Sequence, residues 1–163
     1  MLTIEDVAKQ SREERLSRLT HTADQLALAI AGQPDTVLAK RPAMKAWAGK
    51  EVVCHLRDTE ESFTGRFQTI AAMDDPRFLS VDPDRWADER QYLRNDVVEA
   101  LHAFRRRREE SLAHLKSLAP PQWQRGGVHP SRGRMTVDDL VTLMAWHDEN
   151  HLEQLRRALR GEP

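Results

Sequence analysis

Two histidines one helical turn apart are the residues of this sequence best placed to do chemistry. His147 and His151 lie in an amphipathic segment, and on a helical wheel at about 100° per residue, with Leu140 at zero, they fall at about −20° and 20°. Both therefore occupy the centre of the predicted buried stripe, where the helix backbone has no free groups to satisfy them. The i, i+4 spacing also lets two imidazole nitrogens converge on one metal ion.

A third ligand is needed, and His55 is the best candidate for it. It lies one turn after Val52, at the margin of the apolar stripe of another predicted helix, so it can face the pair across a bundle. Three neutral nitrogens leave a divalent ion with its full charge and an exchangeable position, as in catalytic sites. The residues thus predict one divalent transition metal at His55, His147 and His151, although His-x-x-x-His spacing also occurs by chance and a core histidine is usually only hydrogen-bonded.

The other four histidines are predicted not to bind this metal, because they lie off the buried stripes or in a loop: His21, His102, His114 and His129.

Four amphipathic segments must position these histidines. Apolar residues at helical spacing predict helices over residues 4–31, 49–73, 95–119 and 137–160, with capping boxes beginning at Thr3 and Thr136 and with Asn95 as a cap. Asp-Pro pairs predict a long connection over residues 74–93, with a short helix possible at 84–90, and the Pro- and Gly-rich segment 119–135 predicts a second loop rather than a helix or a central strand. The predicted fold is an all-α four-helix bundle with long connections, in one domain over residues 1–163.

The composition agrees with this fold class and excludes several functions. Charged residues make up 31% and aromatic residues 6%, which favours helices with solvated outer faces. Twenty-five basic residues balance 26 acidic ones, so nucleic acid and anionic membranes are not expected partners. The chain has no apolar run long enough to span a bilayer, and its N-terminus is charged, so we expect a soluble, cytoplasmic protein. The single cysteine excludes an internal disulfide and a multi-thiolate zinc site.

No catalytic base or nucleophile is identified by the sequence. Asp148 replaces the glutamate of the zincin His-Glu-x-x-His motif, which argues against that class of protease. Cys54 falls about 160° from Leu56 on the wheel, which predicts an outward-facing thiol. Asp58 and Asp148 adjoin ligand positions, and supporting a ligand or facing solvent is expected of each.

Arg108 interrupts an otherwise apolar stripe, whereas the neighbouring arginines can pair with acidic residues one turn away. The run from Arg105 to Arg108 is followed by Glu109 and Glu110, so a solvated face is favoured over a nucleic-acid surface. A buried arginine must pair with an anion or reach solvent. Arg108 is therefore predicted to pair within the protein or to bind an anionic substrate or cosubstrate.

Four ordered motifs resemble the DinB superfamily, and within it the YfiT-like group. They are Trp47 with residues 50–58, Asp84-Arg85-Trp86-Ala87, His129-Pro130 with Gly133, and the segment 145–152. Two positions depart from the family pattern: Ala48 replaces a capping Ser or Thr, and Asn150 replaces a histidine.

The resemblance implies a four-helix bundle, often homodimeric, with Zn or Ni on His55, His147 and His151. It also implies a metal-dependent hydrolase or a thiol transferase that acts on a small molecule, the latter with a low-molecular-weight thiol such as bacillithiol as cosubstrate. A non-catalytic metal-binding bundle or a stress-associated protein is the alternative.

Overall fold

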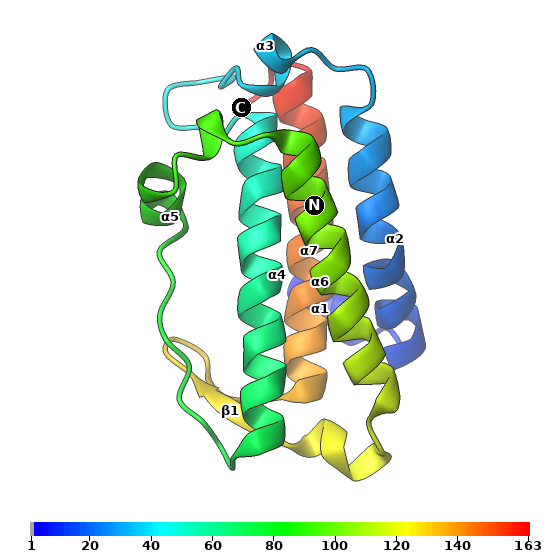
Figure 1. Ribbon diagram of the computed structural model, residues 1–163. Coiled ribbons are helices and arrows are strands. Elements are labelled where there is room, and N and C mark those ends of the chain that lie inside the picture. The colour runs from blue at the N-terminus through cyan, green and yellow to red at the C-terminus, as the bar shows by residue number, and fades with distance from the viewer. Residues whose placement is uncertain (1) are drawn as a thin grey trace.

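Four long helices dominate the computed structural model, which describes residues 2–163 (Figure 1). They are α2 (Arg12–Ile30), α4 (Gly49–Ala72), α6 (Val97–Ser117) and α7 (Val137–Leu159). The predicted all-α four-helix bundle with long connections is confirmed. Within residues 2–163, no helix is both long and apolar enough to cross a membrane.

The prediction of one continuous helix over residues 4–31 is wrong. The chain forms α1 (Ile4–Ala8) and then begins α2 anew, because the Ser11 side chain accepts a hydrogen bond from the Glu14 amide and the Glu14 carboxylate accepts one from the Ser11 amide. The predicted cap Asn95 is also wrong. Asp96 caps α6 instead, and the Asn95 amide group donates to backbone carbonyls just before the helix.

The connections contain more regular structure than the sequence predicts. Residues 31–48 include the short helix α3 (Asp35–Leu38), and the next connection holds α5 (Pro83–Glu89), close to the predicted short helix, and the 3₁₀ turn η1 (Tyr92–Arg94). The segment 119–135 was predicted to be a loop, but it contains the 3₁₀ turn η2 (Pro120–Gln124) and the strand β1 (Gly126–His129), and β2 (Gly133–Thr136) follows.

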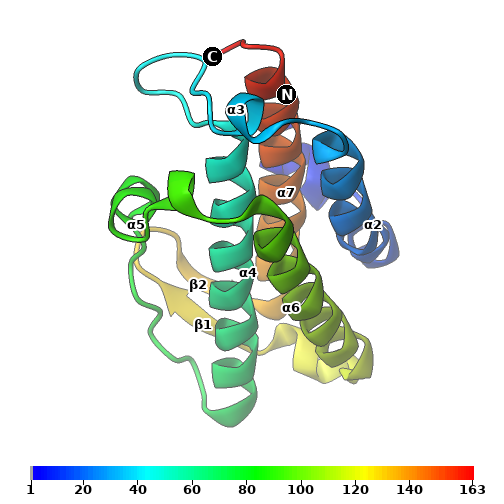
Figure 2. The ribbon, with the colours of Figure 1, turned by 45° about the horizontal axis from the view of Figure 1, so that its top comes forward.

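Two glycines explain why a hairpin forms in this glycine-rich segment. β1 and β2 pair antiparallel, with Gly126 opposite Thr136. Gly133 adopts a φ of 72°, which suits the turn, and a Cβ atom at Gly126 would collide with the Met135 carbonyl. The hairpin lies beside α4, on the side that also carries α5 (Figure 2).

A buried polar layer separates two apolar clusters along the bundle. One cluster contains the N-terminal half of α4 and ends at Leu56, and the other contains its C-terminal half and begins at Phe63. The same division falls between Phe104 and Leu112 on α6. Buried His55, Glu60, Arg108 and Asp148 belong to neither cluster and lie at or near this level of their helices.

Candidate metal centre

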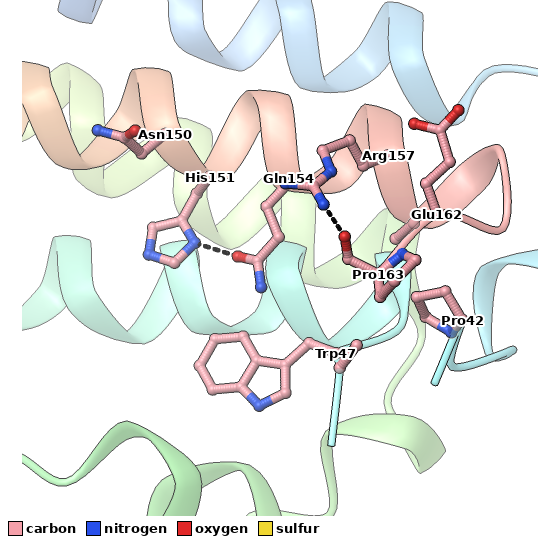
Figure 3. Close-up of a pocket in the computed structure, with 10 residues that line it drawn as sticks. Pro42, Trp47, Asn150, His151, Gln154, Arg157, Glu162 and Pro163 are labelled. Atoms are coloured by element: carbon pink, nitrogen blue, oxygen red, sulfur yellow. Dashed lines mark hydrogen bonds between the residues drawn. The ribbon is translucent and has the colours of Figure 1, made fainter. Parts of the chain in front are cut away.

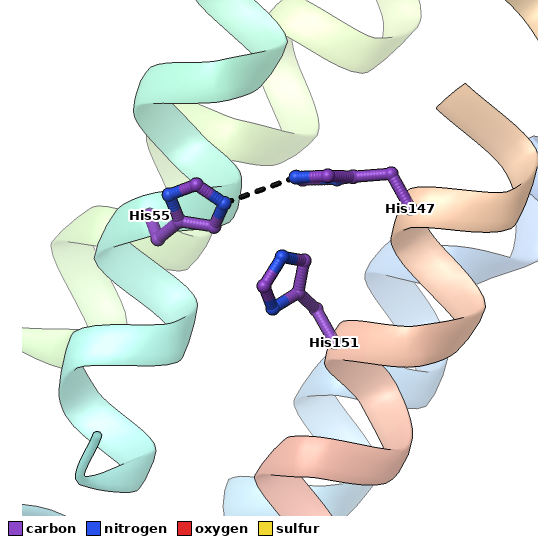
Figure 4. A group of neighbouring side chains, drawn as sticks. All are labelled: His55, His147 and His151. Atoms are coloured by element: carbon purple, nitrogen blue, oxygen red, sulfur yellow. Dashed lines mark hydrogen bonds between the residues drawn. The ribbon is translucent and has the colours of Figure 1, made fainter. Parts of the chain in front are cut away.

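Three imidazoles meet between α4 and α7 (Figure 4). The Nε2 atoms of His55 and His147 are 3.0 Å apart, and one ligand nitrogen from each of His55, His147 and His151 lies within 4.8 Å of the others. The structure thus brings together the three residues that the sequence pattern selects. Coordination of a metal by them stays a prediction.

The spacing and chemistry of these nitrogens fit a divalent transition metal. A tetrahedral ion with bonds of about 2.0–2.1 Å to imidazole holds two ligands about 3.3 Å apart. The 3.0 Å between the His55 and His147 nitrogens lies near this value, and all three nitrogens lie within 4.8 Å of one another. Imidazole donors suit Zn and Ni, whereas Mg and Ca prefer oxygen. A small rearrangement of side chains is enough to place all three nitrogens around one ion.

Neighbouring side chains fix the orientation of the rings. The His151 Nδ1 is 2.7 Å from Gln154 Oε1, so it can donate there while Nε2 stays available as a ligand (Figure 3). The Trp47 ring lies 4.8 Å from that of His55 and stacks at 6.2 Å on that of His151, measured between centroids. Trp47 therefore packs against two of the three imidazole rings and covers one side of the site.

Burial keeps the imidazoles of His55 and His151 in the neutral form that binds metals. It lowers the pKa of His55 to about 2, with a further contribution from His147 and His151, and it lowers the pKa of His151 to about 3. Protons therefore compete weakly with a metal for these nitrogens in the folded protein.

The metal-free protein is expected to lose stability as the pH falls below about 6.5. The unfolded chain protonates these histidines near the ordinary pKa of 6.5, but the folded chain does so only near 3 for His151 and near 2 for His55. The unfolded state therefore binds more protons in this window, which lowers the free energy of unfolding as the pH falls.

Urea denaturation at pH 7, 6 and 5 measures this dependence. His151→Gln should make it shallower, because one titrating group is removed, whereas exposed His102→Gln should leave it unchanged. Equal slopes for wild type and His151→Gln would contradict the assignment.

A buried ion-pair network supports the centre from inside the bundle. Arg108 donates to Glu60 Oε2 and to Asp148 Oδ2, each at 2.7 Å, and its side chain is 3% exposed. Thr22 also donates to Asp148 at 2.8 Å. Burial alone would raise the pKa of Asp148, but Arg108 lowers it below the ordinary value, so this carboxylate is charged. Its Oδ1 lies 3.9 Å from the His147 Nδ1, where it can orient a ligand ring.

Arg108 thus finds its anionic partners within the chain, the first of the two outcomes that the sequence allows. Substrate binding by Arg108 stays a prediction, and this geometry favours a structural role. The sequence interpretation missed Glu60. Glu60 lies four residues after Leu56 and three before Phe63, which places its carboxylate on the buried stripe of α4. A buried carboxylate on one helix could have been matched with the buried arginine, Arg108, on another.

The predicted outward-facing thiol of Cys54 is wrong. The residue is 0% exposed, because Tyr92 and the segment around η1 cover this side of α4, and the thiol lies 3.9 Å from the Tyr92 carbonyl oxygen. Burial raises the pKa of Cys54 to about 11. The wheel position is correct, but α4 is covered on two sides rather than one.

Asp58 and Ala48 also have partners that the sequence does not reveal. Asp58 accepts hydrogen bonds from Arg57, Arg90 and the Tyr92 hydroxyl, at 2.6 to 2.7 Å, and so ties η1 to α4. The amide of Ala48, where the family pattern has a capping hydroxyl, donates to the Glu51 carboxylate at 2.9 Å.

Comparisons with known proteins agree with the fold. The profile of the DinB superfamily matches residues 15–155. The structure of YfiT from Bacillus subtilis, a candidate metal-dependent hydrolase with an unusual four-helix bundle topology, superposes with a TM-score of 0.86 at 22% identity, over 93% of this chain and 89% of that one. That likeness shows the fold.

Relatives with assigned names are candidate metal-dependent hydrolases. One from Oceanobacillus iheyensis is 26% identical over 67% of this chain, although the match spans only 63% of that protein. A second from the same organism is 24% identical over 97% of this chain and 88% of the relative. One from Halalkalibacterium halodurans is 25% identical over 89% of this chain and 78% of the relative.

Proposed function

Because the chain belongs to the DinB superfamily, we propose that it is an enzyme that hydrolyses a small-molecule substrate with one Zn or Ni ion held by His55, His147 and His151. The observation that carries this proposal is the convergence of one buried and two partly buried imidazoles, with low pKa values at His55 and His151, between α4 and α7. The names of the relatives support the same class of reaction.

A bound ion supplies Lewis acidity, which polarises a substrate carbonyl and acidifies a water or thiol. The chain supplies the environment. His55 and His151 are neutral donors, Asp148 and Gln154 orient His147 and His151, and Arg108 holds Asp148 ionised.

A cavity beside His151 offers access to this centre. Its volume is about 290 Å³, and its walls include Trp47, His151, Gln154 and Arg157 (Figure 3). The indole and the aliphatic parts of these side chains suit the apolar body of a small molecule, which would lie against the His151 ring.

Transfer of a low-molecular-weight thiol such as bacillithiol is the second candidate function. The donor set favours it, because three neutral nitrogens leave a divalent ion its full charge, which attracts a thiolate. The buried thiol of Cys54 is not available to act instead. In this reaction the sulfur nucleophile would come entirely from the cosubstrate.

Metal analysis followed by a paired activity assay tests the proposal. Protein purified without added metal is expected to hold about one Zn or Ni ion per chain, and a panel of esters and amides should be cleaved without added thiol. Removal of the metal by a chelator should abolish cleavage, and its return should restore it. Turnover only with added thiol would favour the second candidate. Cleavage that survives complete metal removal would contradict both.

Four further inferences from the sequence stay predictions: substrate binding by Arg108, a homodimer, a cytoplasmic location and a single domain spanning the chain.

A further inference from the structure

A second cavity follows α4 away from the metal centre. Its volume is about 510 Å³, and it lies between α4 and the connection that leads to α5. Ser62, Arg66 and Thr69 belong to its α4 wall, which also carries Asp58 and Glu61. The first three of them continue the face of His55 and Thr59, because the steps between these five positions are 4, 3, 4 and 3 residues. We call this cavity the α4 groove.

Arg66 is the unusual residue of the α4 groove. Its guanidinium carbon lies 5.4 Å from the centroid of the Phe63 ring and 5.2 Å from that of Phe78. Burial lowers its pKa, and no acidic group in residues 2–163 offsets this effect. Arg108, in contrast, is buried with two carboxylates. A half-buried cation without a counter-ion is costly unless an anion joins it.

The two acidic groups of the groove each have an arginine partner. Asp58 pairs with Arg57 and Arg90 at 2.6 Å, and Glu61 lies 3.5 Å from Arg107. Exposed Arg77 adds a further positive charge to the wall. The charge left over in the α4 groove is therefore positive, which suits an anionic ligand.

Phe63 connects the groove to the metal centre. Its buried ring lies 6.4 Å from that of His147, edge to face, and the Arg66 guanidinium lies over the same ring. Arg66 lies 11 residues after His55, which is about 16 Å along the helix axis. Arginine side chains on a helix lean towards its N-terminus, which shortens this distance. One elongated small molecule can therefore reach both.

We propose that the α4 groove binds the oxyanion end of the substrate, a carboxylate or a phosphate, on Arg66. The rings of Phe78 and Trp86, which line the groove, then flank an apolar body that extends towards the metal centre. Guanidinium pairs well with either oxyanion, because its planar fork matches two oxygens. The identity of the bound molecule as the substrate rests on the proposed function, but the anion site does not.

Titration of the metal-free protein with benzoate and with phenyl phosphate, followed by NMR of the Trp86 indole and the backbone amides of residues 77–81, tests the site. Both anions are expected to shift these signals in wild type, and benzyl alcohol should not. Arg66→Gln should weaken binding by about 10-fold to 100-fold, the usual effect of a charge-assisted hydrogen bond. Arg66→Lys should restore part of the affinity. Arg106→Gln is the matched control, because Arg106 is exposed and lies outside the groove.

The outcomes separate this proposal from the proposed function. Equal anion affinity in wild type and folded Arg66→Gln overturns the anion site, whether or not the protein holds metal. Binding of phenyl phosphate only when Zn is present also overturns it, because the anion would then bind the ion. Arg66-dependent binding, together with a failure of the histidines to take up added Zn or Ni, supports the anion site and contradicts the proposed function. The relative response to the two probes distinguishes a carboxylate site from a phosphate site.

Discussion

Replacing His147 with alanine is expected to lower the affinity for Zn or Ni by at least about 100-fold, because a site of three protein ligands loses one of them. The His147 Nε2 lies 3.0 Å from that of His55, so no other described side chain replaces it at that point. Elemental analysis after gel filtration gives the stoichiometry, and competition with a chelating dye at pH 7 gives the affinity.

His102→Ala is the matched control for this result. His102 is exposed on α6 and away from the three-histidine group, so this variant should hold one ion as wild type does. Circular dichroism must show that His147→Ala keeps the helical fold. Retention of stoichiometric metal with unchanged affinity in His147→Ala would show that the ion, if any, binds elsewhere.

Replacing Arg108 with methionine should reduce the free energy of unfolding by about 3–5 kcal/mol at pH 7, the usual effect of removing one partner from a buried ion pair. The change leaves Glu60, which is 1% exposed, and Asp148, which is 4% exposed, without their shared cation. Asp148 should then take up a proton at higher pH than before, because Arg108 no longer offsets the effect of burial on its pKa. The difference in the free energy of unfolding between wild type and Arg108→Met should therefore shrink as the pH is lowered towards 4. Urea denaturation at several pH values measures it.

Arg106→Met is the control for the loss of an arginine from α6. Because Arg106 is exposed, its replacement should change the free energy of unfolding by less than about 0.5 kcal/mol. If Arg108→Met is as stable as wild type but binds benzoate more weakly, Arg108 serves a ligand rather than the fold.

The sequence predicts the four long helices well because each carries an apolar stripe of many residues. The helix over 137–160 and its capping box at Thr136 correspond closely to α7. Errors arise where a single local contact decides the structure. Ser11 and Glu14 divide the first helix by hydrogen bonds that compete with a weak apolar pattern, and the hairpin depends on the close approach of Gly126 to Met135. Periodicity carries no information about such contacts.

The three histidines are predictable for the same reason as the helices, since a polar residue in the middle of an apolar stripe requires a partner. Their supporting residues are not. Glu60 and Arg108 are 48 residues apart in the chain and lie on different helices. Their pairing depends on how α4 and α6 are rotated about their axes. Arg66 is harder still, because its importance comes from having no acidic partner of its own among residues 2–163.

The buried position of Cys54 has a consequence for how the protein responds to oxidants. Its thiol is 0% exposed, and its pKa of about 11 leaves almost no thiolate at neutral pH. Thiolates are the forms that react with peroxides and disulfides, and this chain contains one cysteine. The single thiol of the chain should therefore be nearly inert to oxidation. Under oxidative stress, a loss of the thiol-dependent activity proposed above would therefore come from the cosubstrate pool or from another group, and not from oxidation of Cys54.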